Sequence, residues 1–249
     1  MPHFEHQGNR LFFRERGEGA PVLLLPGNTA SSASLEEELD HFGRRFRAIA
    51  LDYPGTGRSG RIDEWPEDWW ERSADAAAAL VEHIGDRRAA LIGASGGAIV
   101  ALLAAIRRPD RVRAVIADSF TLRMPPPLVK RWVEEERARR TEEQVRFWTA
   151  AHGPDWEQPV DADGRFLLRF AGTGGDPFGG RLSSIGCPVL LTASSADSFL
   201  PDAAEDGRAA AKEIPECVSL IVDRGAHPLL WSRPGFFRRV ADGFLDRLT

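Results

Sequence analysis

The chain has 249 residues with 43% hydrophobic and 28% charged side chains, which suits one large α/β domain with a small insertion. A formal net charge of −5 and a pI near 5.7 provide no concentrated basic face, so we expect no nucleic-acid partner. The first ten residues lack an apolar signal core, and no later segment is long enough to cross a bilayer. These features predict a cytoplasmic protein that acts without a membrane. The chain is expected to be a monomer or a homodimer, a choice that the sequence leaves open.

Two cysteines, Cys187 and Cys217, border apolar runs. Two cysteines by themselves cannot build a disulfide framework or a metal site, so we expect both to be small buried residues.

Strand and helix signals alternate through the first 118 residues. Short apolar runs predict strands, and longer segments with a packing face predict helices. The expected strands are at 11–16 (antiparallel), 22–25, 46–51, 89–92 and 112–117. The expected helices between them are at 35–45, 69–84 and 96–108. This alternation predicts a mostly parallel sheet with helices on both faces.

The alternation stops after Asp118. Residues 119–184 contain the run Met124-Pro-Pro-Pro127, a charged helical run through Arg140, a second helical piece with Phe147 and Trp148, and a stretch rich in glycine and proline. We therefore predict a helical cap here. The sheet pattern then resumes with strands at 188–193 and 218–222 and helices at 202–213 and 235–248. We therefore expect a core formed by residues 1–118 and 185–249.

The sequence Gly93-Ala94-Ser95-Gly96-Gly97 fits the pattern G-x-S-x-G between a predicted strand and a predicted helix. A sharp turn in this position exposes a serine hydroxyl above the sheet, and glycines on either side relieve the crowding. A helix N-terminus also favours developing negative charge. The context predicts that Ser95 is a nucleophile.

A nucleophilic serine needs a histidine that takes its proton. His227 lies in the loop directly after the last predicted strand, and loops at the carboxyl ends of strands converge in an open α/β sheet. We expect His227 to be the base, with His152 in the insertion as its rival. His3 and His6 are expected in a polar tail, and His41 and His83 on helices.

The histidine in turn needs an orienting acid. Asp197 follows the strand at 188–193, and the chain order Ser95, Asp197, His227 is the order of nucleophile-elbow hydrolases. Asp118 follows the strand at 112–117 and is the competing candidate. If it is not the acid, we expect Asp118 to hold the entrance of the insertion or to face the substrate pocket.

Backbone N–H groups must also stabilise the oxyanion. We expect these donors at Gly96, after the nucleophile, and at Asn28, in the loop after the strand at 22–25. The glycine-rich segment 52–60 fits neither phosphate-loop pattern and predicts a structural turn. No metal-binding pattern occurs, so we expect no metal.

Taken together, these segments resemble the α/β-hydrolase superfamily from about residue 10 to the end. The resemblance is carried by Leu-Leu-Leu-Pro-Gly27, Leu-Asp-Tyr-Pro-Gly-Thr-Gly-Arg-Ser59, Gly-Ala-Ser-Gly-Gly97, the strand leading to Asp197, and Gly-Ala-His227. Within the superfamily, the chain looks like the valacyclovir-hydrolase-like (biphenyl-hydrolase-like) branch, whose helix opens much like Pro66-Glu-Asp-Trp-Trp-Glu-Arg72 here.

The resemblance implies an eight-stranded, mostly parallel sheet flanked by helices, a helical cap and no cofactor. It also implies the triad Ser95, Asp197 and His227. Two positions depart from the pattern. Pro26-Gly27 replaces the His-Gly of most members, and Gly96 stands where valacyclovir hydrolase has an aspartate that binds the substrate's amino group, which favours an uncharged acyl group.

The predicted function is a serine hydrolase that cleaves small to medium carboxylic esters. C–C bond hydrolysis, amide cleavage and cofactor-free perhydrolysis use the same machinery and stay open, as does a non-catalytic ligand receptor on the same fold. The expected partner is a small ester-like molecule. Aromatic residues of the insertion are candidate pocket walls, namely Trp132, Phe147, Trp148, Trp156, Phe166 and Phe170.

Overall fold

A computed structural model describes residues 2–248. Its centre is a sheet of eight strands in the order β1-β2-β4-β3-β5-β6-β7-β8. The strands are β1 (His3–His6), β2 (Asn9–Arg16), β3 (Pro21–Leu25), β4 (Arg47–Leu51), β5 (Ala89–Ala94), β6 (Val112–Asp118), β7 (Val189–Ser194) and β8 (Cys217–Val222). The pairs β1–β2 and β2–β4 are antiparallel, and all other neighbours are parallel. The predicted mostly parallel, eight-stranded sheet is therefore confirmed.

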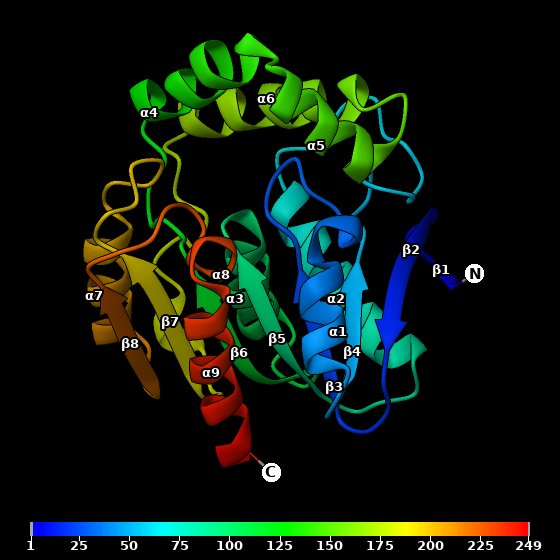
Figure 1. Cartoon of the computed structure of the whole chain (residues 1–249), viewed down its shortest axis with the longest axis vertical. Coiled ribbons are helices and arrows are strands. Elements are labelled where there is room, and N and C mark those ends of the chain that lie inside the picture. Colours follow the sequence, from blue (N-terminus) through cyan, green and yellow to red (C-terminus); the bar gives the residue numbers. More distant parts are fainter. Residues whose placement is uncertain (1, 249) are drawn as a thin grey trace.

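Helices cover both faces of the sheet (Figure 1). On one face, α1 (Glu36–Phe42) and α9 (Pro234–Leu245) bury Leu39, Phe42 and Phe237 against the sheet. On the other face lie α2 (Trp69–His83), α3 (Gly96–Arg107) and α7 (Ala203–Glu213). Strands β3 and β5 are buried along nearly their whole length because both of their faces are covered, which explains their continuous apolar sequences.

Three helices follow β6 and lie across the carboxyl ends of the parallel strands, at the top of Figure 1. They are α4 (Pro126–Lys130), α5 (Glu142–His152) and α6 (Glu157–Gly172). Between α4 and α5 the chain forms a π-helical segment at Arg131–Glu136 and a short 3₁₀ turn at Arg137–Arg139. We call residues 126–172 the cap segment. The division of the chain into a core and a separate cap at 119 and 184 stays a prediction.

The start and end of the chain differ from the sequence-based expectation. Residues 3–6 form strand β1 instead of a polar tail, because Phe4 is buried and its ring packs edge-on against Phe13 of β2. One apolar residue is too weak a signal in a four-residue strand. At the other end, the expected helix at 235–248 is α9, followed by a 3₁₀ turn at Asp246–Leu248.

A short helix that the sequence did not suggest, α8 (Leu229–Ser232), precedes α9. The two cysteines are half-buried and both free, and burial raises the pKa of each thiol to about 11. Within residues 2–248, none of the helices combines the length and apolar character needed to traverse a bilayer.

Candidate active site

Ser95 occupies a strained turn between β5 and α3. Its backbone has φ 57° and ψ −123°, a region that residues other than glycine rarely adopt. A Cβ at Gly93 would lie 2.1 Å from the carbonyl oxygen of Gly97, and a Cβ at Gly97 would lie 2.0 Å from that of Leu25. The two glycines are thus required by backbone atoms that approach too closely for any side chain, and they leave the serine hydroxyl exposed to the space above the sheet.

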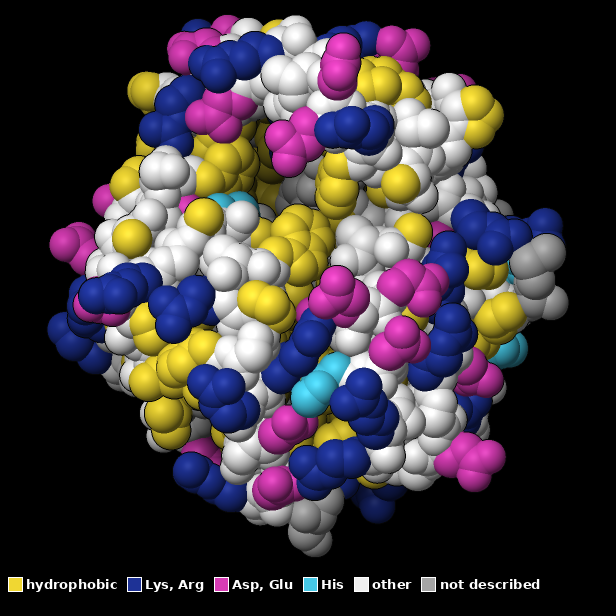
Figure 2. Space-filling model, viewed as in Figure 1, with side chains coloured by type: hydrophobic (Ala, Val, Ile, Leu, Met, Phe, Trp, Pro, Cys, Tyr) yellow, Lys and Arg dark blue, Asp and Glu magenta, His cyan; other side chains and the backbone are white. Residues whose placement is uncertain are grey.

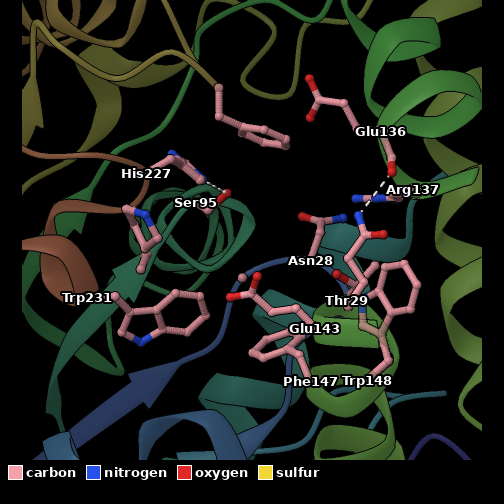
Figure 3. Close-up of a pocket in the computed structure, with 15 residues that line it drawn as sticks. Asn28, Thr29, Ser95, Glu136, Arg137, Glu143, Phe147, Trp148, His227 and Trp231 are labelled. Carbon is pink, nitrogen blue, oxygen red and sulfur yellow. Dashed lines mark hydrogen bonds between the residues drawn. The ribbon is translucent and has the colours of Figure 1, made fainter. Parts of the chain in front are cut away.

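His227 and Asp197 meet Ser95 across long stretches of sequence. His227 Nε2 lies 2.9 Å from Ser95 Oγ, and His227 Nδ1 lies 2.8 Å from Asp197 Oδ2. The first of these contacts is drawn as a dashed line in Figure 3. The other oxygen of Asp197 accepts hydrogen bonds from the backbone N–H groups of Phe199 and Leu200, each at 2.9 Å. The carboxylate is therefore fixed by its own loop and aims one oxygen at the histidine.

The imidazole ring is held between its two partners by packing. Phe199 stacks on His227 with ring centroids 4.8 Å apart, and Asp197 is almost completely buried. A histidine bonded through both nitrogens can pass a proton from a serine hydroxyl to a leaving group while the carboxylate stabilises its charged form.

Asp118, the competing acid, lies elsewhere. It is completely buried, and its two oxygens accept hydrogen bonds from Thr192 Oγ1 at 2.7 Å and the backbone N–H of Leu230 at 2.9 Å. Burial raises its pKa to about 6. Asp118 lines neither cavity at Ser95, so its expected place in the pocket is wrong. It instead ties β6 to β7 and to the segment that follows His227.

His152, the rival base, is also engaged elsewhere. Its Nδ1 accepts from the backbone N–H of Gly57 at 2.9 Å, and its Nε2 lies 3.0 Å from the carbonyl oxygen of Thr29. This buried ring joins α5 to the glycine-rich turn, which agrees with the structural reading of residues 52–60.

Two cavities meet at Ser95. The outer one has a volume of about 360 Å³ and opens between the cap segment and the sheet, where Figure 2 shows a hollow bordered by hydrophobic side chains. The inner one has only about 30 Å³ and is mostly apolar, with walls that include Ile99, Phe120, Met124 and Leu167. Asn28 and Ser95 line both cavities, so a substrate carbonyl at Ser95 would direct its two substituents into spaces of very different size.

The predicted pocket walls divide into three groups. Phe147 and Trp148 line the outer cavity, and Trp132 lines the inner one. Trp156, Phe166 and Phe170 line neither. Trp156 stacks behind Trp148 with centroids 5.1 Å apart, whereas the two phenylalanines pack against Trp70 of α2.

Several lining residues had no motif to reveal them. Trp231 of α8 faces the outer cavity four residues after His227, and its ring lies 5.8 Å from that of Phe147. Glu136, Arg137 and Glu143 of the cap segment also reach this cavity (Figure 3). Chain proximity to His227 was a usable signal for Trp231, but the cap residues depend on how the helices lie over the sheet.

The expected oxyanion donors are adjacent in space. The backbone nitrogen of Asn28 lies 3.2 Å from the point where a Cβ on Gly96 would be, so the two residues are neighbours. Their role as oxyanion donors stays a prediction. Among residues 2–248, His, Cys, Asp and Glu side chains do not come together in any group of three or more that could hold a metal ion.

Comparisons with known proteins identify the family. Residues 20–148, more than half of the chain, match the alpha/beta hydrolase fold family. The RutD protein of Azorhizobium caulinodans, named for the hydrolysis of carbamate, is 27% identical over 100% of this chain and 99% of its own. The human serine hydrolase BPHL is 33% identical over 113 residues, 44% of this chain and 39% of that one.

A thermophilic esterase from Thermogutta terrifontis has a similar fold, with a TM-score of 0.77 and 21% identity over 99% of this chain and 97% of its own. The similarity to BPHL supports the predicted resemblance to biphenyl-hydrolase-like proteins. On the family match and the eight-stranded sheet, the chain is a member of the α/β-hydrolase family.

Proposed function

We propose that the protein is a serine hydrolase that cleaves small to medium carboxylic esters through an acyl-enzyme intermediate. The observation that carries the proposal is the continuous chain of contacts from Ser95 Oγ through His227 to Asp197, at 2.9 Å and 2.8 Å. A serine hydroxyl becomes a strong nucleophile when a base takes its proton and a third group orients that base. The hydrolase names of RutD and BPHL support the same reaction class.

In the proposed reaction, Ser95 Oγ attacks the ester carbonyl while His227 Nε2 takes the hydroxyl proton. Asp197 stabilises the imidazolium, and the backbone N–H groups of Asn28 and Gly96 bind the oxyanion. The imidazolium then gives its proton to the alcohol oxygen as the C–O bond breaks. Water, activated by the same histidine, hydrolyses the acyl-serine and releases the acid.

The sizes of the two cavities favour an ester with a small acyl group over the larger substrates of C–C bond hydrolysis. The inner cavity of about 30 Å³ accepts a small acyl group, whereas the outer cavity of about 360 Å³ accepts the alcohol. C–C bond cleavage, amide cleavage and perhydrolysis by the same residues are the alternatives that a substrate panel distinguishes.

The test combines a covalent probe with turnover. A fluorophosphonate should label Ser95, and the protein should release p-nitrophenol from p-nitrophenyl acetate, whereas Ser95→Ala should remain folded and do neither. Ser34→Ala, a serine in the short helix before α1, is the matched control and should keep both activities. Turnover that survives in Ser95→Ala contradicts the assignment, and tight ester binding without labelling or turnover identifies a ligand receptor.

A further inference from the structure

A buried polar cluster joins the loop after β3 to the cap segment. Asp163 of α6 is completely buried, and its Oδ1 accepts a hydrogen bond from the side-chain Nδ2 of Asn28, 135 residues away in the sequence. Its Oδ2 accepts from Nη1 of Arg137, which completes an ion pair. None of these contacts belongs to the chain of residues from Ser95 to Asp197.

The charge of Asp163 determines which way the Asn28 amide faces. Burial raises the pKa of the Asp163 carboxyl, but the Arg137 guanidinium opposes that rise, and both oxygens already accept hydrogen bonds. In its ion pair with Arg137, the carboxylate accepts a hydrogen bond at each oxygen. The NH₂ group of Asn28 must therefore point to Asp163, and its carbonyl oxygen must point away.

That oxygen faces the reaction centre. In Figure 3 the side-chain oxygen of Asn28 lies toward Ser95 and the nitrogen toward Arg137. A Cβ on Gly96 would lie 1.7 Å from Asn28 Oδ1, so the amide occupies the space that a side chain at position 96 would need. Within the described residues 2–248, no donor reaches Asn28 Oδ1. An accessible acceptor of fixed orientation thus stands beside the nucleophile.

We propose that Asn28 Oδ1 accepts a hydrogen bond from an N–H on the acyl side of the substrate, and that Asp163 is the positioning residue that fixes this acceptor. The preferred substrates are then carbamates, in which the nitrogen is bonded directly to the scissile carbonyl carbon. The inference rests on the proposed serine-hydrolase function and replaces its carboxylic acyl group with a carbamoyl group as the preferred one. The small inner cavity suits a carbamoyl group, which has few atoms.

The reaction balances as for an ester. Ser95 Oγ forms a bond to the carbamoyl carbon, the bond to the leaving alcohol oxygen breaks, and the serine proton passes through His227 to that oxygen. Water then cleaves the carbamoyl-serine and releases carbamic acid. The hydrogen bond to Asn28 Oδ1 orients the plane of the N–C(=O) group. It takes no part in the bonds that form and break.

The test compares two substrates of the same shape, p-nitrophenyl N-methylcarbamate and p-nitrophenyl propanoate, in which CH₂ replaces the N–H. Acylation is followed as p-nitrophenol release after subtraction of the spontaneous rate. In Asp163→Asn the neutral amide can donate to Asn28 Oδ1, which lets Asn28 turn its NH₂ group toward Ser95. The carbamate-to-propanoate ratio of acylation rates should fall by roughly three- to ten-fold, the value of one hydrogen bond.

The carbamate-to-propanoate ratio of each variant is divided by the same ratio of the wild type. This division cancels the difference in intrinsic reactivity between the two substrates. Arg137→Gln, which removes the guanidinium paired with Asp163 Oδ2, should lower the ratio in the same direction. Asp161→Asn is the matched control, since Asp161 lies on the same helix, exposed and paired with Arg140, and its ratio should not change. Thermal unfolding establishes that each variant is folded.

An unchanged ratio in folded Asp163→Asn overturns the inference. If neither variant folds, the inference is tested on the wild type by its apparent dissociation constants for the two substrates. The constant should be lower for the carbamate than for the propanoate. The opposite order overturns the inference. Failure of the proposed function gives a different pattern, because Ser95 then remains unlabelled and neither substrate is acylated.

Discussion

His227 Nδ1 lies 2.8 Å from Asp197 Oδ2, and the same imidazole reaches Ser95 Oγ with its other nitrogen. The acid is held independently of the histidine, because the backbone N–H groups of Phe199 and Leu200 bind its second oxygen. Asp197 can therefore select the tautomer of His227 in which Nδ1 carries the proton and Nε2 is free to accept from Ser95.

Asp197→Asn tests this selection. The amide keeps the shape of the side chain but can donate to Nδ1, which leaves the proton on Nε2 and removes the base. We expect kcat for p-nitrophenyl acetate to fall by roughly 10³- to 10⁴-fold with an intact fold. Asp202→Asn, at an exposed position before α7, should keep full activity. A drop of less than ten-fold in Asp197→Asn would assign the orienting role to another group.

Gly96→Ala tests the contact between Asn28 and the nucleophile turn. The new Cβ would lie 1.7 Å from Asn28 Oδ1, so the amide must move and lose its hydrogen bond to Asp163. We expect a loss of roughly 1.5–3 kcal/mol in the free energy of unfolding, the value of a hydrogen bond to a charged group, and at least a ten-fold loss of kcat.

The control for this variant is Gly172→Ala at the end of α6, where a Cβ would meet no atom within 4 Å. Its stability, measured by urea denaturation, should stay close to that of the wild type. A Gly96→Ala protein as stable and active as the control would show that Asn28 is not held in place.

Trp231→Ala tests the width of the outer cavity. Trp231 and Phe147 approach one another from α8 and α5, with ring centroids 5.8 Å apart. Removal of the indole should raise kcat/KM for a naphthyl ester relative to an ethyl ester of the same acid by roughly ten-fold, since about 1–3 kcal/mol of steric cost is relieved. Val218→Ala, exposed on β8, should leave the ratio unchanged. A constant ratio in Trp231→Ala would exclude this constriction as a determinant of alcohol size.

Because His152 is buried, we expect the stability of the protein to depend on pH. Burial lowers its pKa to about 4, whereas the unfolded chain titrates near 6.5. Because the unfolded state binds the proton more tightly between these values, the free energy of unfolding should fall as the pH drops from about 6.5 to about 4. The full loss from this residue is about 3 kcal/mol.

His152→Gln isolates that contribution. The wild type should exceed the variant in unfolding free energy at pH 7, and the difference should shrink by about 2–3 kcal/mol on going to pH 4.5, measured by urea denaturation at each pH. His83→Gln, at the end of α2, controls for the loss of a histidine as such. A difference that stays constant with pH would mean that His152 is not buried in its neutral form.

The order of strands and helices could be predicted from local patterns because the parallel strands are buried on both faces and read as short apolar runs. The G-x-S-x-G turn added a strong local constraint, since Gly93 and Gly97 leave no space for a Cβ. Strand β1 and helix α8 escaped prediction because each is only four residues long and gains its stability from tertiary contacts.

By itself, the sequence determined the order of the main strands and helices and placed Ser95, Asp197 and His227 after three separate strands. Only the tertiary structure decided how the cap helices lie over those strands. In the folded chain, Asp118 lies outside the pocket, Trp231 lines it, and Asp163 accepts a hydrogen bond from Asn28. Local patterns record backbone preferences over a few residues, whereas contacts such as Asn28–Asp163 span 135 residues and depend on the packing of whole helices.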